Sequence, residues 1–298
     1  MAPNRGARGR MSRPGFVLKA SCPDRVGVVA AVTGFLAARN ALIMELSHFV
    51  DEDAQKSFLR VDFEDDAAGA EGHAALHRAF EESVATALDM AFEIHPGAHR
   101  MRTLITVSRQ GHCLNALLHQ WRDGHLPIEI TGIVSNHETL RKLADWYELP
   151  FHHFPIENGD TASQEARILD RFEETRSELL VLARYMQILS PAACARLAGR
   201  AINIHHSFLP GFKGARPYHQ AFRRGVKLIG ATAHYVTNEL DEGPIIEQDV
   251  VRVNHAEQPG ELERLGQDVE STVLARAVRW HAQHRVFEHD SRTIIMRH

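Results

Sequence analysis

Between residues 103 and 207, short apolar runs alternate with longer amphipathic segments, and this rhythm constrains the fold more than any other feature of the chain. The runs lack polar alternation, which is typical of strands buried on both faces of a parallel sheet. The pattern predicts a doubly wound, Rossmann-like α/β domain with a parallel sheet. The expected strands are Thr103–Ser108, Ile128–Val134, Phe151–Pro155, Leu179–Arg184 and Ile202–Ser207. The expected helices are His112–Trp121, Glu138–Glu148, Gln164–Arg176 and Pro191–Leu197.

A different rhythm precedes this domain, in the order strand, helix, strand, strand, helix, strand, which is the βαββαβ order of a ferredoxin-like sandwich. The expected strands are Phe16–Ala20, Leu42–Val50, Ser57–Phe63 and Ala91–His95, with helices Val28–Arg39 and Ala74–Met90. Pro96-Gly97-Ala98-His99-Arg100 has the composition of a linker. We therefore expect a first domain over residues 14–95, a linker over 96–100 and a second domain over 101–298. Residues 1–13 are rich in arginine and lack the apolar core of a secretion signal, so they are expected to form a disordered tail.

Composition excludes several classes of function. The chain has 34 Lys and Arg against 38 Asp and Glu, a net charge of −4, so no general affinity for nucleic acid is expected. No segment approaches the ~20 continuous apolar residues that span a bilayer, and a membrane partner is not expected either. The cysteines are Cys22, Cys113 and Cys194, odd in number and far apart, so a disulfide framework is not indicated. These features favour a reducing cytoplasm.

The 20 histidines suggest a metal site, but the known ligand spacings are missing. No HExxH is present, and the adjacent pairs His152-His153 and His205-His206 are expected to point to opposite sides of a strand. Neither a GxGxxG nor a GxxxxGK[ST] motif occurs, so neither a dinucleotide nor a nucleoside triphosphate is supported. We expect no metal and no organic cofactor.

Residues 201–243 hold the densest cluster of polar side chains and turn formers. Asn203 and His205 are two residues apart on a predicted strand and share one of its faces. An amide beside an imidazole suits an oxyanion developing on a carbonyl or formyl carbon. After the strand predicted at Gly230–Val236, the acidic turn around Asp241 offers a carboxylate that could position a nucleophile or manage protons. Each signal alone also has a structural explanation, because Asn-x-His can be incidental and an Asp before Gly-Pro is a common turn residue.

Longer stretches of sequence favour the catalytic over the structural interpretation of these residues. The segment INIHHSFLPGFKGARPYHQAFRRGVKLIGATAHYVTNELDEGPIIEQDVVRV resembles the core of the hydrolases and transferases that use 10-formyltetrahydrofolate. Over Met101–Met296 the chain is similar to the formyltetrahydrofolate deformylase family, with VSRQGHCLNALLHQW, VSNHETLRKLA, PFHHFPI, LVLARYMQILSP and VLARAVRWH in the expected order. CPDRVGVVAAVTGFLA resembles the ACT domain that precedes the catalytic domain in that family.

The resemblance implies hydrolysis of 10-formyltetrahydrofolate to formate and tetrahydrofolate, which balances folate pools and supplies formate for purine synthesis. It implies that Asn203, His205 and Asp241 are catalytic. It also implies a folate pocket formed by Met186, Gln187, Ile188, Leu189, His234, Asn238, Glu239 and Leu240. For Met186, Ile188 and Leu189 plain core packing is the alternative, and for His234 it is a buried structural histidine.

Three other functions were weighed against this one. A formyltransferase acting on an amine such as glycinamide ribonucleotide carries a glycine-rich phosphate loop after its first strand, where this chain has Ser108–Cys113 with one glycine. Formyl transfer to initiator tRNA is less favoured, because the enzyme for that reaction appends a C-terminal β-barrel and only ~15 residues follow the last helix here, near VLARAVRWH. A catalytically inactive amino-acid or folate sensor is disfavoured by the intact Asn203, His205 and Asp241.

The ACT-like segment departs from its family. A Gly-Gly-Asn-Ile turn is usual there, whereas this chain has Asn40-Ala41-Leu42-Ile43, and Ser47 and His48 replace an Asp and a Gln. Loss of the turn amide at Leu42 removes a group able to hold an amino acid. We expect a homo-oligomer in which this domain serves assembly, with a weak or absent response to glycine or methionine.

Overall fold

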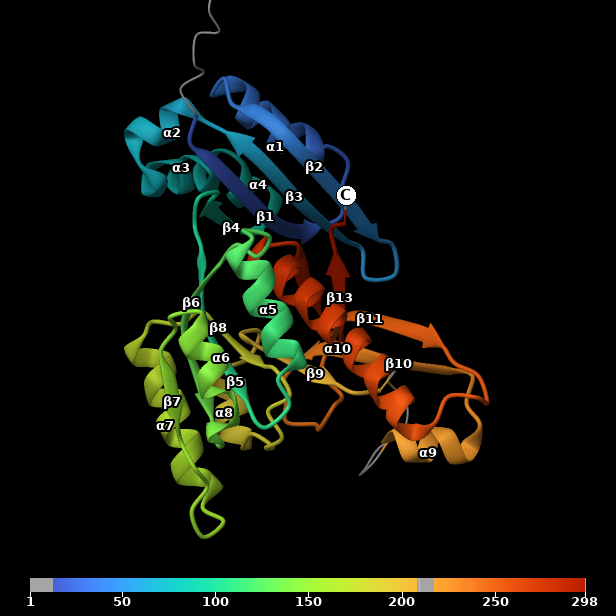
Figure 1. The fold of residues 1–298 in the computed structure, drawn as a ribbon. Coiled ribbons are helices and arrows are strands. Elements are labelled where there is room, and N and C mark those ends of the chain that lie inside the picture. Colours follow the sequence, from blue (N-terminus) through green and yellow to red (C-terminus); the bar gives the residue numbers. More distant parts are fainter. Residues whose placement is uncertain (1–12, 208, 210–216, 298) are drawn as a thin grey trace, which may run out of the picture. The chain divides into compact units, whose positions relative to one another are not determined.

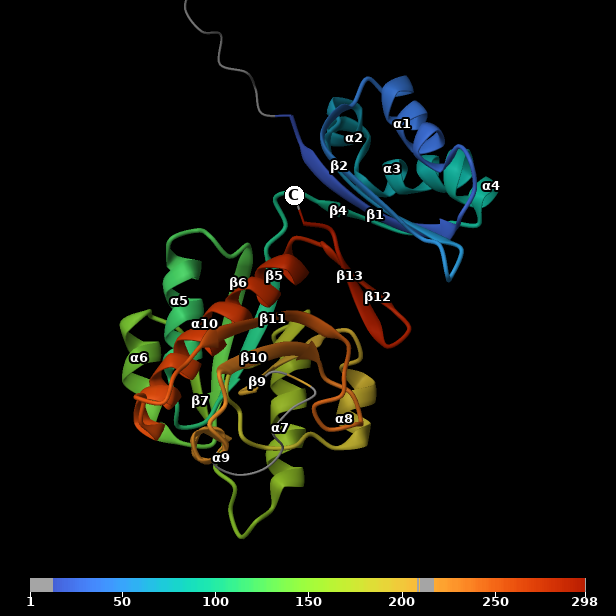
Figure 2. The same ribbon diagram turned by 90° about the vertical axis from the view of Figure 1, so that its right-hand side faces the viewer.

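The structure is a computed structural model that describes residues 13–207, 209 and 217–297 (Figures 1 and 2). The chain divides into two compact units, one reaching to His99 and including the residues from Met296 onward, the other Arg100–Ile295. The tail expected over residues 1–13 lies outside the described residues, apart from Arg13, which forms an ion pair with Asp66 at 3.0 Å. In the described part of the chain, no helix combines the length and apolar character needed to cross a membrane.

The first unit is a four-stranded antiparallel sheet of order β2-β3-β1-β4 with helices packed on one face. This is a ferredoxin-like βαββαβ arrangement. Its strands are β1 (Gly15–Pro23), β2 (Leu42–Asp51), β3 (Lys56–Glu64) and β4 (Ala91–Pro96). Its helical segments are α1 (Val28–Ala38), α2 (Asp66–Glu71), α3 (His73–Phe80), the π-helical turn η1 (Glu81–Ala85) and α4 (Thr86–Leu88).

The helix expected over Ala74–Met90 is therefore not one regular helix. A separate short helix α2 precedes it, because the Asp65 side chain caps that helix by accepting from Ala68 N at 3.0 Å. Gly72, with φ of 91°, then breaks the helical path before α3 begins. Residues 81–85 adopt the wider π spacing, a local insertion that helices absorb without ending.

The second unit contains a seven-stranded sheet of order β11-β10-β9-β8-β5-β6-β7. Its strands are β5 (Met101–Val107), β6 (Ile128–Ser135), β7 (Phe151–His153), β8 (Leu179–Leu182), β9 (Ala201–His205), β10 (Leu228–Tyr235) and β11 (Ile245–Arg252). The strands from β5 to β9 are parallel, as the continuous apolar runs predict. The predicted parallel sheet is thus present, and β10 and β11 extend it with antiparallel pairing. β10 runs antiparallel to both β9 and β11, because the chain re-enters the sheet beside β9 without a crossover.

Helices cover both faces of this sheet (Figures 1 and 2). One face packs on α5 (His112–Arg122), α6 (Arg141–Trp146) and the long α10 (Pro259–Ala282), and the other on α7 (Thr161–Glu174) and α8 (Pro191–Arg196). The sequence pattern did not predict β11, α9 (Pro217–Arg224) or the hairpin of β12 (Val286–His289) and β13 (Arg292–Ile295). A short 3-10 turn, η2 (Glu138–Leu140), precedes α6.

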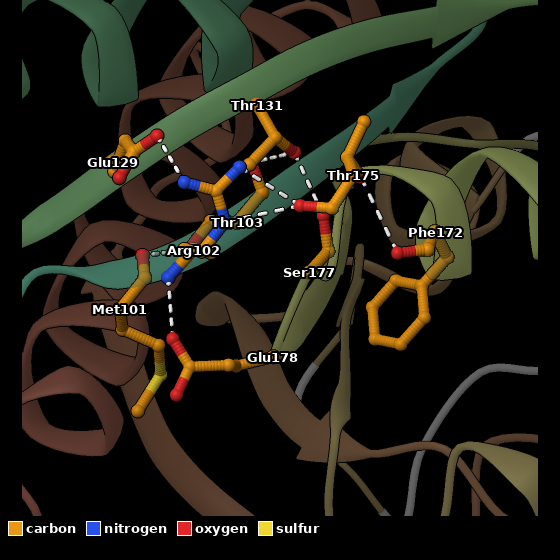
Figure 3. Close-up of polar contacts among 9 residues, drawn as sticks. All are labelled: Met101, Arg102, Thr103, Glu129, Thr131, Phe172, Thr175, Ser177 and Glu178. Carbon is orange, nitrogen blue, oxygen red and sulfur yellow. Dashed lines mark hydrogen bonds and ion pairs between the residues drawn. The ribbon is translucent and has the colours of Figure 1, made fainter.

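A polar cluster ties together the amino-terminal ends of three neighbouring strands, β6, β5 and β8 (Figure 3). The Arg102 guanidinium donates to the Thr175 carbonyl oxygen from Nε at 3.0 Å and Nη2 at 2.8 Å, and it pairs with Glu129 of β6. The backbone N–H of Arg102 donates to Glu178, just before β8, at 2.9 Å. These contacts connect the strands at their amino-terminal ends. Parallel sheets bind ligands at the opposite edge, at the carboxyl ends of the strands.

Candidate active site

A cavity of about 210 Å³ lies between three segments of the second unit: the loop after β8, the end of β9 and the connection from β10 to β11. All of the predicted site residues line it: Met186, Gln187, Ile188, Leu189, Asn203, His205, His234, Asn238, Glu239, Leu240 and Asp241. Segments far apart in the chain thus meet in one space. The role of each side chain there remains a prediction.

Strand β9 presents Asn203 and His205 to the cavity. Ile202 and Ile204 belong to the core on the α5 and α10 face, so the alternating residues lie on the opposite face, where Ala201 packs with the α8 core. Opposite Asn203 on β10 is the buried His234, whose Nε2 lies 3.2 Å from Asn203 Nδ2. His234 is thus buried in the sheet and also holds the amide that reaches the cavity, and its part in folate binding stays a prediction.

Asp241 reaches the same place from the β10–β11 connection. Its Oδ2 lies 3.1 Å from His205 Nδ1, and its Oδ1 lies 3.7 Å from His234 Nε2. Its backbone is left-handed, with φ of 57°, a conformation that Asp tolerates better than most residues. Burial alone would raise the pKa of Asp241, but hydrogen bonds and charge from His205 and His234 outweigh it and hold that pKa well below its usual range. The carboxylate is thus ionised and a weak proton acceptor.

The loop after β8 is anchored at both ends and exposes apolar side chains between them. The buried Tyr185 hydroxyl donates to Gln164 Oε1 at 2.6 Å, and the Ser190 N–H donates to Glu165 at 2.6 Å. Met186 and Ile188 are 58% and 73% exposed, so core packing does not explain them. An apolar surface held over a cavity suits a flat ring system.

Arg184 lines the cavity and was not predicted from the sequence. His206 lines it too, although the sequence predicted that its side chain points away from His205; Cys194 and Thr237 are further lining residues. The rings of His205 and His206 are stacked, with centroids 4.9 Å apart and planes at 24°. The expectation that this pair points to opposite sides of a strand is therefore wrong, because β9 ends at His205 and the chain bends there. A charged residue at the end of a run of apolar residues, as at Arg184, was the signal available in the sequence.

Behind the cavity, one donor cluster also differs from expectation. Ligand atoms of His112, Cys113 and Glu270 lie within 4.8 Å of one another, so the expectation that no residues have ligand geometry is wrong for this set. Glu270 comes from α10, and no local spacing could have found it. Its carboxylate already accepts from His112 Nε2 and from the Tyr218 hydroxyl, each at 2.8 Å. Burial raises the pKa of the Cys113 thiol far above its usual value, which disfavours the thiolate that binds metals.

The chain that carries this amide, two histidines and a carboxylate is similar to known proteins in sequence and in structure. Residues 101–278 match the family model described as "Formyl transferase", so the chain belongs to the formyl transferase family. A transferase of that family with a solved structure, glycinamide ribonucleotide transformylase 1 from Symbiobacterium toebii, has a TM-score of 0.64 and 28% identity, covering 68% of this chain and 97% of that one.

Relatives with both units define the group more narrowly. Formyltetrahydrofolate deformylase from Corynebacterium sp. (strain P-1) is 48% identical over 94% of this chain and 98% of its own length. The crystal structure of formyltetrahydrofolate deformylase from Burkholderia mallei has a TM-score of 0.89 and 51% identity, covering 95% of this chain and 100% of that one. The chain belongs to the formyltetrahydrofolate deformylase family.

Proposed function

We propose that this protein hydrolyses 10-formyltetrahydrofolate to formate and tetrahydrofolate. The observation that carries the proposal is the contact of the ionised Asp241 with His205, beside Asn203, in a cavity of a chain that belongs to the deformylase family. These groups can polarise a formyl carbon, bind a water and support proton transfer without an amine acceptor.

In the proposed reaction, a water oxygen adds to the formyl carbon to give a tetrahedral intermediate. Asn203 and protonated His205 stabilise its oxyanion. The bond from that carbon to N10 then breaks, N10 takes up a proton, and formate leaves. The water supplies one oxygen and two protons, so no oxidant or reductant is needed.

The low pKa of Asp241 refines its role. A carboxylate with a low pKa is a weak base. Asp241 therefore orients the water and stabilises the His205 imidazolium, while the His205 imidazole accepts the proton from the water. His205 Nε2 has Ser207 Oγ as a neighbour at 2.7 Å, which holds the other side of the ring. These side chains together provide water activation and oxyanion stabilisation, and we propose a reaction without a metal or organic cofactor.

The pterin ring of the substrate would lie against Met186, Ile188 and Leu189. Met186 and Ile188 are exposed and fill no core, whereas Leu189 also packs against the core that contains Tyr185 and Ala193. The 238–240 segment closes the other side of the cavity. Leu240 is 56% exposed and adds to the apolar rim.

The test is incubation of the purified protein with 10-formyltetrahydrofolate alone, following formate and tetrahydrofolate. We expect both products in equal amounts without any amine. Strict dependence on an added amine would instead assign a folate-dependent formyltransferase, and binding without turnover would assign a sensor.

The remaining proposals concern the cellular setting. We propose that the first unit is an ACT domain that supports a homo-oligomer, based on its ferredoxin-like topology. The chain's acidic net charge argues against a nucleic-acid partner. The described cysteines, Cys22, Cys113 and Cys194, are all free and buried, which suits a cytoplasmic protein that acts on folate pools and releases formate for purine synthesis.

A further inference from the structure

Arg184 has an unusual backbone conformation for a side chain of its kind. It lies two residues after the end of β8 and has φ of 64°, in the left-handed region that favours glycine. It is also 91% buried, with a relative exposure of 9%. A strained non-glycine residue beside a candidate active site indicates that its side chain contributes something that glycine would not.

The Arg184 guanidinium joins three partners from three different elements. Nε and Nη2 donate to Gln110 Oε1 at 2.9 and 2.7 Å, and Nη1 donates to His206 Nδ1 at 2.7 Å. Nε also lies 3.3 Å from Glu270 Oε2. A planar guanidinium with several donors in a fixed fork suits such a position, where a single ammonium would reach fewer partners.

Glu270 gives this guanidinium a rigid anchor. Its side chain is 1% exposed on α10, and its oxygens accept from His112 of α5 and Tyr218 of α9. Burial would raise the pKa of Glu270, but the hydrogen bond from His112 and the Arg184 charge lower it overall, so the carboxylate is ionised. Three helices therefore hold the negative charge that orients Arg184.

His206 connects this network to the catalytic ring. Because Arg184 donates to Nδ1, the His206 proton resides on Nε2 and the ring is neutral. Its plane is thereby set, and it stacks on the His205 ring with centroids 4.9 Å apart. His205 then has its ring position defined on three sides, by His206, by Asp241 and by Ser207.

We propose that Arg184 is a positioning residue for the reaction: anchored by Glu270, it holds the His206 ring flat against His205 and so keeps the His205 imidazole aligned with Asp241. This inference rests on the proposed function. Arg184 acts through His206, and its effect belongs to the chemical step rather than to folate binding.

The test compares kcat and KM for formate release by the wild type, Arg184→Gly and Arg176→Gly. Arg176 is the matched control, because it is also a left-handed arginine, with φ of 49°, and is exposed away from the cavity. We expect Arg184→Gly to lose roughly a hundredfold in kcat, the effect of a ~1 Å misplacement, with little change in KM. Arg176→Gly should keep the wild-type kcat. Guanidinium ion added at millimolar concentration should restore part of the kcat of Arg184→Gly and leave Arg176→Gly unchanged.

A double-mutant cycle with His206→Asn tests the route through His206. Because both substitutions break the same contact, their effects on kcat should not add. Arg184→Lys, which keeps the charge beside Glu270 but not the fork, serves if Arg184→Gly fails to fold, and it should also lose kcat.

Two kinds of failure are distinguishable. A wild-type protein that releases no formate overturns the proposed function and this inference with it. An active wild type with an equally active Arg184→Gly, or fully additive losses in the cycle, overturns the inference alone.

Discussion

Asp241 Oδ2 lies 3.1 Å from His205 Nδ1. His205 is the last residue of β9, whereas Asp241 lies in the connection between β10 and β11, so the two meet only because that connection folds back toward β9. The contact pairs an ionised carboxylate with a ring that His206 and Ser207 hold on two other sides. We therefore expect turnover to depend on the carboxylate at position 241 rather than on its acidic neighbour Glu242.

Replacing Asp241 by Asn keeps the side-chain shape but removes the charge that stabilises the His205 imidazolium and orients the water. We expect kcat to fall by about two orders of magnitude or more, with folate binding nearly intact. Glu242→Gln is the matched control, since Glu242 is exposed in the same turn, and it should change the rate by less than about tenfold. Steady-state kinetics and folate binding on both variants check this. An inactive Glu242→Gln beside an active Asp241→Asn would show that the wrong carboxylate has been assigned.

The pH dependence of stability should report on His206. Burial, followed by the charge of Arg184, lowers the pKa of His206 from 6.5 to about 4. Between these values the unfolded chain binds a proton that the folded protein does not, so this residue makes stability fall as the pH falls. When the pH is lowered from 7 to 5, the free energy of unfolding should fall in both proteins. We expect this fall to be about 2 kcal/mol smaller in His206→Asn than in the wild type. Urea denaturation at both pH values measures it, and equal losses in the two proteins would contradict a half-buried, neutral His206.

Removal of metal ions should leave activity unchanged. The only described donor set with ligand geometry, His112, Cys113 and Glu270, is already occupied by hydrogen bonds and by the positive charge of Arg184. Dialysis against a chelator, followed by formate release, checks the expectation. Loss of activity that zinc or iron restores would instead identify a metal centre, and Cys113→Ser would then test whether it lies in this cluster.

Glycine and methionine should have little effect on the rate. At the start of β2 the chain has Leu42, whereas the resemblance to ACT domains implies an amide at this position that could hold an amino acid. Formate release measured over a range of each amino acid checks this, with Leu42→Asn as the variant expected to gain a response. A clear saturable effect on the unchanged protein would contradict a role for this domain in assembly alone.

Much of the fold followed from local patterns. The βαββαβ order, the parallel strands β5 to β9 and the shared face of Asn203 and His205 all follow from hydrophobic periodicities of a few residues, which backbone geometry imposes within each element. The resemblance of longer strings then pointed to Asp241, which no periodicity could connect with β9.

What only the tertiary structure decided are the contacts between distant segments. The antiparallel entry of β10, the stacking of His206 on His205, and the meeting of Arg184 with Glu270 depend on how loops and helices from separate parts of the chain pack. Arg184 lies in the loop two residues after a short strand and Glu270 in the middle of a long helix, and nothing in the sequence near either residue specifies the other. Local sequence sets which way a side chain points from its own element, whereas the packing of elements sets what it meets there.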